Sequence, residues 1–384
     1  SPLSPASIHC TWSAGMGLAA QSSSDWLLSF ANPVAWSPTA PSMARALEVF
    51  AHTVEVRGKP AFDLHTTIVD GVSVPVTEAV VLRKPFGQLK YFQREVTGRR
   101  DPRILIVAPM SGHYATLLRG TVERMLESAE VFITDWADAK MVPLSAGRFD
   151  LDDYIDYLID FAEHVHLEAN GGEAGGQRIH MMAVCQPSVP AFAATALMNL
   201  HKSPATPATL TMMGGPIDAR KSPTSVNNLA TNKSFEWFEN NVIYRVPPNF
   251  PGAGRRVYPG FLQYTGFVAM NPDRHANSHY DYFKDLIKGD GASVEAHRKF
   301  YDEYNAVLDM DADYYLETIA TVFQDFKLVR GTWDVRSEDG EIERVRPQDI
   351  TGCGLLTVEG ELDDSHHRST VSGWRFDQLP WQQC

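Results

Sequence analysis

The stretch Arg178–Leu200, RIHMMAVCQPSVPAFAATALMNL, decides the fold class of this 384-residue chain. Its first seven residues, Arg178–Val184, form a short apolar run that is typical of a strand buried on both faces of a sheet. Its end, Val189–Leu200, has the composition of a buried helix. Cys185 stands between the two, with a small alanine two residues before it and Pro187, a type favoured in a first helical turn, two residues after it. The pattern predicts a sharp turn from strand to helix with Cys185 at its tip.

Strand-like and helix-like stretches alternate on both sides of this segment. Further buried strands are predicted at Arg103–Ala108, Glu130–Trp136, Thr209–Met213 and Gly354–Glu359. Further helices are predicted at Thr116–Glu127 and Leu151–His166. This alternation with short links predicts an α/β fold with a doubly wound, mostly parallel sheet. Upstream, residues 59–95 alternate apolar and polar side chains in places, which predicts antiparallel edge strands with a turn at Asp70-Gly71.

Composition divides the chain into four parts. Residues 1–60, rich in Ser, Ala and Trp, are expected to form an N-terminal extension, and residues 61–220 the first part of the core. Residues 221–330 break the alternation with aromatic, Pro and Gly residues, so we expect an inserted cap. Helices are expected within it at Val294–Asn305 and Tyr314–Phe326. Residues 331–384 are expected to complete the core and to end in an atypical tail, as if the last part of the core were truncated or altered.

Charge and cysteine content narrow the classes of function. The formal net charge of −13 argues against a nucleic-acid partner. No apolar run reaches the roughly 18 residues of a membrane helix, and no basic segment followed by an apolar run marks a secretory signal. The four cysteines are too scattered for a disulfide framework or a zinc site; they are Cys10, Cys185, Cys353 and Cys384. We expect a cytoplasmic protein that needs no metal.

The predicted turn at Cys185 is the strongest candidate for a catalytic site. A helix N-terminus favours a thiolate at this position, and the backbone amide of Gln186 could bind an oxyanion. A buried cysteine that acts only as a small apolar side chain is the alternative.

Two loops at the ends of predicted strands carry the remaining candidates. Asp363 follows the last strand and is the preferred catalytic acid, with Asp364 as second choice; a solvated acidic turn is the alternative. The loop after the first buried strand could supply a second oxyanion amide from Ser111. His113 in that loop is either close to Cys185 or an ordinary loop histidine. Trp136 either shapes the pocket or packs in the core.

Long ordered blocks of the chain resemble the intracellular poly(3-hydroxybutyrate) depolymerases, a family with an α/β-hydrolase core and a Cys nucleophile. The blocks are APMSGHYATLLRGTV, TDWADAKMVP, AVCQPSVP, TMMGGPIDARKSPTSVNNLATNKSFEWFENNVIYRVP, GRRVYPGFLQYTGFVAMNPDRH, FYDEYNAVLDM and TVEGELDD. They lie between about residues 60 and 364. The resemblance implies that Cys185 is the nucleophile, that Asp363 is the acid, and that the substrate is amorphous polyester in intracellular granules.

The resemblance also sets expectations about the histidine. The family carries its catalytic His in a Gly-His-Tyr-Gly motif near the C-terminus, whereas this sequence ends in SHHRSTVSGWRFDQLPWQQC. His366 and His367 follow Asp363 closely, so they and His113 are the candidates. No cofactor is required, although coenzyme A could replace water as acyl acceptor. The expected partner is the polyester granule surface, with no membrane or nucleic acid, and the oligomeric state stays open.

Three functions remain open at this point. The first is ester hydrolysis through a Cys acyl-enzyme. The second is a polyester synthase, an acyltransferase of related fold that also uses Cys, Asp and His. The third is an inactive homologue that only binds granules.

Overall fold

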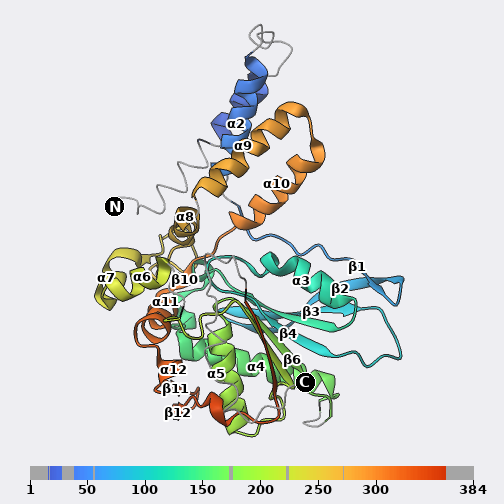
Figure 1. Ribbon diagram of the computed structural model, residues 1–384, viewed down its shortest axis with the longest axis vertical. Coiled ribbons are helices and arrows are strands. Elements are labelled where there is room, and N and C mark those ends of the chain that lie inside the picture. The colour runs from blue at the N-terminus through green and yellow to red at the C-terminus, as the bar shows by residue number, and fades with distance from the viewer. Residues whose placement is uncertain are drawn as a thin grey trace. The chain divides into compact units, whose positions relative to one another are not determined.

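The computed structural model describes residues 16, 18–27, 39–54, 57–172, 176–221, 225–270 and 272–359 (Figure 1). The chain divides into two compact units. The helical unit combines Ser1–Pro60 with Gly260–Val307, and the sheet unit combines Ala61–Pro259 with Leu308–Cys384. The predicted cap, residues 221–330, is not one of these two units, and its bounds remain a prediction.

The sheet unit is built on eight strands in the order β1-β2-β3-β5-β4-β6-β7-β13. The first three pair antiparallel, and β3 also runs antiparallel to β5. From β5 to β13 every neighbouring pair is parallel. The strands are β1 Thr66–Val69, β2 Val72–Lys84, β3 Gly87–Arg94, β4 Arg103–Val107, β5 Glu130–Trp136, β6 His180–Val184, β7 Thr209–Met213 and β13 Gly354–Val358. The predicted doubly wound, mostly parallel sheet is confirmed.

Helices cover both faces of this sheet, with α3 on one side and α4 and α5 on the other (Figure 1). The helices are α3 Arg119–Leu126, α4 Leu151–Ala169 and α5 Ser188–Leu200. On the α3 side, Val122 packs in one core cluster with Val131 and Ile133 of β5. The side chain of Asp150 caps α4 by accepting from the backbone amide of Asp153, whose carboxylate accepts from the amide of Asp150 in return.

The predicted elements agree with the structure except at their ends. The predicted turn at Asp70-Gly71 is confirmed, because both residues adopt positive φ, at 50° and 79°, between β1 and β2. The helix predicted from Thr116 is preceded by a 3-10 turn, Ala115–Leu118. The helix predicted at Tyr314–Phe326 is in fact α11, Ala312–Thr318, followed by a π-helical turn at Ile319–Gln324.

The remaining part of the sheet unit contains short elements. They are α6 Ser225–Asn232, α7 Phe235–Val242, β8 Tyr244–Arg245, β9 Arg256–Tyr258, β10 Met310–Asp311, α12 Lys327–Arg330, β11 Asp334–Arg336 and β12 Ile342–Arg344. Arg255, just before β9, is buried and pairs with Asp311 at 2.9 Å. Because Asp311 also caps α11 by accepting from the amide of Asp313, this ion pair fixes the start of α11.

The helical unit contains α2 Ala40–Val54, α8 Gly260–Met270, α9 Pro272–Lys288 and α10 Gly291–Tyr304. Imidazole and phenol rings pack between these helices. The ring of His297 lies between Tyr282, with centroids 4.1 Å apart, and Tyr301, at 4.5 Å. His52 of α2 approaches the same group and bonds Asp302 at 3.1 Å.

Candidate active site

Cys185 occupies the tip of a sharp turn between β6 and α5, as predicted. Its φ of 70° lies in the left-handed region, which is rarely adopted by residues with a side chain. Such a conformation costs about 1–3 kcal/mol and is concentrated at functional sites. The amide of Cys185 donates to the carbonyl oxygen of Met213 at 2.7 Å, which ties the turn to the end of β7. The geometry is that of a nucleophile elbow, with a partly exposed thiol.

Gly215 makes this turn possible, and the sequence reasoning missed it. A Cβ on residue 215 would lie 2.3 Å from the Cβ of Ser188 and 3.0 Å from the carbonyl oxygen of Cys185. A larger residue at this position would therefore displace the elbow or the start of α5. The signal in the sequence was the Gly214-Gly215 pair directly after the predicted strand Thr209–Met213.

The loop that carries Ser111 leaves the sheet beside the elbow. β4 and β6 are parallel neighbours, with Val107 opposite Ala183. This loop and the elbow therefore both begin at the carboxyl ends of adjacent strands. The carbonyl oxygen of Gly112 accepts from the amide of Leu308 at 2.7 Å. His113 is buried, at 6% exposure. The arrangement is compatible with an oxyanion amide from Ser111; that role, and a role for His113, stay predictions.

Two buried aromatic residues bond the ends of these strands. The Trp136 indole Nε1 donates to the carbonyl oxygen of Ala108 at 2.9 Å. The Tyr314 hydroxyl donates to the side-chain Oε1 of Gln186 at 2.8 Å. Both alternatives for Trp136 were open from the sequence, and the structure shows a core residue at 1% exposure. The sequence did not predict the contact between Tyr314 and Gln186, because Tyr314 falls within the predicted cap, 128 residues away along the chain.

The last strand also ends where the other parallel strands have their carboxyl ends. β13 runs parallel to β7 with Val358 opposite Met213, and the amide of Gly214 donates to the carbonyl oxygen of Val358 at 2.8 Å. The predicted acid Asp363, with Asp364, His366 and His367, lies outside the described residues. Their roles stay predictions.

The second cysteine of the described residues differs from Cys185 in its surroundings. Cys353 is 2% exposed, and burial raises the pKa of its thiol to about 11. A neutral thiol is a poor nucleophile, so Cys353 acts as a small apolar residue.

Within the described ranges, no group of three or more His, Cys, Asp or Glu side chains is placed to hold a metal ion. None of the helices described is long and apolar enough to cross a membrane.

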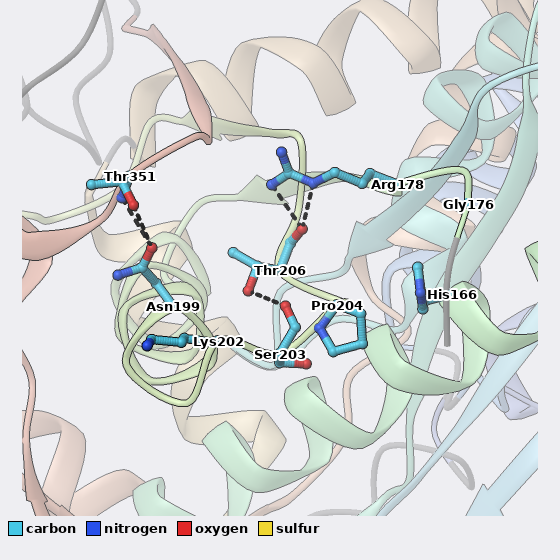
Figure 2. A pocket seen from close by; sticks show the side chains of 9 residues that line it. All are labelled: His166, Gly176, Arg178, Asn199, Lys202, Ser203, Pro204, Thr206 and Thr351. Carbon is cyan, nitrogen blue, oxygen red and sulfur yellow. Dashed lines mark hydrogen bonds between the residues drawn. The ribbon is translucent and has the colours of Figure 1, made fainter. Parts of the chain in front are cut away.

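A polar cavity of about 430 Å³ lies beside the residues that precede β6 and β7 (Figure 2). Cys185 follows the other end of β6. Its lining residues are His166, Gly176, Arg178, Asn199, Lys202, Ser203, Pro204, Thr206 and Thr351. Arg178 precedes β6, and its guanidinium donates to the carbonyl oxygens of Thr206, Pro207 and Gly352. These bonds tie three chain segments together, and of the predicted site residues that the structure describes, Ser111, His113, Cys185 and Gln186, none lines the cavity. Its features are those of a structural clamp.

Taken together, the sheet order, the elbow and the helices on both faces define an α/β-hydrolase fold. A comparison with protein families matches residues 214–371 to the family described as "PHB de-polymerase C-terminus". This part of the chain is similar to the C-terminal region of the poly(3-hydroxybutyrate) depolymerases, so the resemblance seen in the sequence is confirmed. The family match supports ester hydrolysis in general terms. A comparison with curated proteins finds no sequence match.

Among solved structures, the chain is similar to esterases and lipases. An esterase of Pyrobaculum calidifontis is 10% identical over 41% of this chain and 50% of that chain, with a TM-score of 0.30. The Bacillus licheniformis lipase BlEst2 in mature form is 10% identical over 51% of this chain and 67% of that chain, with a TM-score of 0.27. Esterase Est22 is 16% identical over 44% and 56%, with a TM-score of 0.30. The chain thus spans about half the length of the first of these structures.

Proposed function

We propose that this chain hydrolyses poly(3-hydroxybutyrate) through an acyl-enzyme on Cys185. The observation that carries the proposal is the left-handed Cys185 at the tip between β6 and α5, in a chain whose residues 214–371 match the depolymerase family. The substrate class comes from the family match and from the resemblance.

The proposed reaction has two displacement steps at one carbonyl carbon. The Cys185 thiolate attacks an ester carbonyl, and the amides of Gln186 and Ser111 bind the resulting oxyanion. The C–O bond breaks, and the alcohol end of the polymer leaves with the proton that the thiol gave up. Water then attacks the thioester, and a 3-hydroxy acid leaves as the thiol is restored.

A histidine with an acid partner is proposed to carry the proton between these steps. Asp363 is the acid, and His113, His366 and His367 are the candidates for the base. Coenzyme A in place of water would release a 3-hydroxyacyl thioester instead of the free acid. The surface of the polyester granule is the proposed partner.

The direct test is release of 3-hydroxybutyrate from amorphous granules by the full chain. We expect release by the parent chain and a loss of at least 100-fold in Cys185→Ala, because the nucleophile is absent. Cys353→Ala is the matched control, since it removes the other described cysteine without touching the elbow. Equal release from the parent and Cys185→Ala would show that Cys185 is not the nucleophile.

Two further assays separate the rival functions. Polymer growth from 3-hydroxybutyryl-CoA would identify a synthase, and co-sedimentation with granules without any product would identify a non-catalytic binder. Either result would overturn the proposal of hydrolysis. Added coenzyme A, with 3-hydroxybutyryl-CoA as the product sought, distinguishes thiolysis from hydrolysis.

A further inference from the structure

Three aromatic rings from three elements of the sheet unit form a continuous column. Trp136 ends β5, Tyr154 lies in α4, and Tyr314 lies in α11. The ring centroids of Trp136 and Tyr154 are 4.3 Å apart, with planes 26° from parallel. Those of Tyr154 and Tyr314 are 5.2 Å apart at 21°. All three residues are at most 1% exposed, so the column is rigid core structure.

The two outer residues of the column, Trp136 and Tyr314, each form a hydrogen bond with a segment that is expected to supply an oxyanion amide. At one end, the Trp136 indole holds the carbonyl of Ala108, which opens the loop with Ser111. At the other end, the Tyr314 hydroxyl holds the carboxamide of Gln186, the residue after Cys185. Among the described side chains, Tyr314 is the one that bonds Oε1 of Gln186.

The rest of the Gln186 carboxamide is poised for a further contact. Its Nε2 is buried and has no hydrogen-bond partner within the described structure. An unsatisfied buried amide destabilises the folded state, so another contact of the same side chain must offset this cost. The hydrogen bond from Tyr314 is such a contact. Because it engages Oε1 of Gln186, Nε2 is the atom left as a donor.

The Tyr314 hydroxyl is protonated at neutral pH. Burial raises the pKa of Tyr314 far above its ordinary value. The hydroxyl is therefore a constant donor and not a proton carrier. This argues for a structural contribution to the site and against acid–base chemistry by Tyr314.

We propose that Tyr314 is a positioning residue of the active site: it orients Gln186, and through Gln186 the oxyanion amide beside Cys185. The inference rests on the proposed function and deepens it. Trp136 holds the Ala108 side in the same way, and the stacked column keeps the two sides in register. Preorganised donors act by their fixed position, so a small loosening costs rate and leaves substrate binding nearly unchanged.

The test uses Tyr314→Phe, which removes the hydroxyl and retains the ring of the column. We expect kcat on a short soluble ester, p-nitrophenyl butyrate, to fall about 10-fold with KM changed less than about 2-fold. Gln186→Met should have a similar effect. The double variant should be no slower than the slower single variant, because both remove the same bond.

Tyr315→Phe is the matched control, because Tyr315 is the next residue of α11 and stacks on Tyr258 instead of the column, with centroids 4.0 Å apart. It should retain the parent kcat. Equal kcat in the parent and Tyr314→Phe, or a loss shared by Tyr315→Phe, would overturn the positioning role.

A second readout separates this inference from the proposed function. The rate at which iodoacetamide alkylates Cys185, followed on its peptide by mass spectrometry, reports on the elbow without any ester turnover. We expect Tyr314→Phe to change this rate at least 3-fold and Tyr315→Phe to leave it unchanged. A parent chain that cleaves no ester, yet shows this difference, refutes the function and supports the positioning. Unchanged alkylation together with unchanged kcat refutes the positioning alone.

Discussion

Gly215 lies so close to Ser188 that no other residue fits between the end of β7 and the start of α5. An added Cβ would stand 2.3 Å from the Cβ and 2.4 Å from the Oγ of Ser188. Ser188 is fully buried and its hydroxyl donates to the carbonyl oxygen of Ala183 at 3.3 Å, so it cannot turn away without losing this bond. The contact joins the strand after the elbow to the helix that begins with it.

Gly215→Ala should therefore destabilise the sheet unit and distort the elbow. Overpacking of this kind costs about 1–3 kcal/mol, and we expect a lower melting temperature by calorimetry together with reduced ester hydrolysis. Gly120→Ala is the control, because nothing lies within 4 Å of its Cβ position. Adding Ser188→Gly should restore part of the activity, since it removes two of the three clashing atoms. No difference between the two alanine variants would contradict this packing argument.

The elbow could be predicted from sequence because its signal is local. A buried strand, a turn residue and a buried helix follow one another from Arg178 to Leu200, and each is visible in the pattern of apolar residues. The contacts that hold it are not local: Tyr314 is 128 residues from Gln186. Spacing alone does not show which distant side chain meets the turn. Asp363 and the histidines after it stay predictions, since they lie beyond residue 359.

The buried ion pair of Arg255 and Asp311 should be essential for the start of α11. Asp311→Asn leaves the guanidinium of Arg255, at 3% exposure, with uncharged partners: backbone carbonyl oxygens and the ring of Phe86. Breaking a buried pair on one side costs about 3–5 kcal/mol, so we expect a large loss in the free energy of unfolding by urea titration. Because α11 carries Tyr314, kcat on p-nitrophenyl butyrate should fall as well.

The exposed pair of Arg344 and Asp334 supplies the comparison for that experiment. Both side chains are 45% exposed, and exposed pairs contribute about 0–1 kcal/mol. Asp334→Asn should thus change the free energy of unfolding by less than about 1 kcal/mol. If the two asparagine variants are equally stable, the buried pair does not anchor α11.

The two described cysteines should differ sharply in their reactivity toward alkylating agents. Burial raises the pKa of Cys353 to about 11, so almost none of it is thiolate at pH 7.5, whereas Cys185 stands partly exposed at a helix N-terminus. Iodoacetamide at pH 7.5 should modify the Cys185 peptide and leave the Cys353 peptide intact, as measured by mass spectrometry. Modification should abolish ester hydrolysis at the same rate. Loss of activity with an unmodified Cys185 would point to a different nucleophile.

The helical unit should lose stability as the pH falls, because it holds imidazoles that protonate poorly when folded. The pKa of His297 is lowered to about 4, chiefly by burial, with smaller lowering effects of His279, His52 and Arg298 and an opposing effect of Asp302. In the unfolded chain this histidine binds a proton near the ordinary pKa of about 6.5, so the unfolded state becomes favoured as the pH drops. The loss should therefore develop between about pH 6.5 and pH 4 and level off below.

Hydrogen exchange measured peptide by peptide distinguishes this loss from a general acid effect. After correction for intrinsic rates, protection of α10 should fall between pH 7 and pH 5 far more than protection of α4. His297→Phe retains a ring between Tyr282 and Tyr301 but cannot take a proton, so its α10 should show a weaker pH dependence. Some dependence should remain, because burial also lowers the pKa of His279 and of His52. An α10 whose protection is as pH-dependent in His297→Phe as in the parent would exclude His297 as the source.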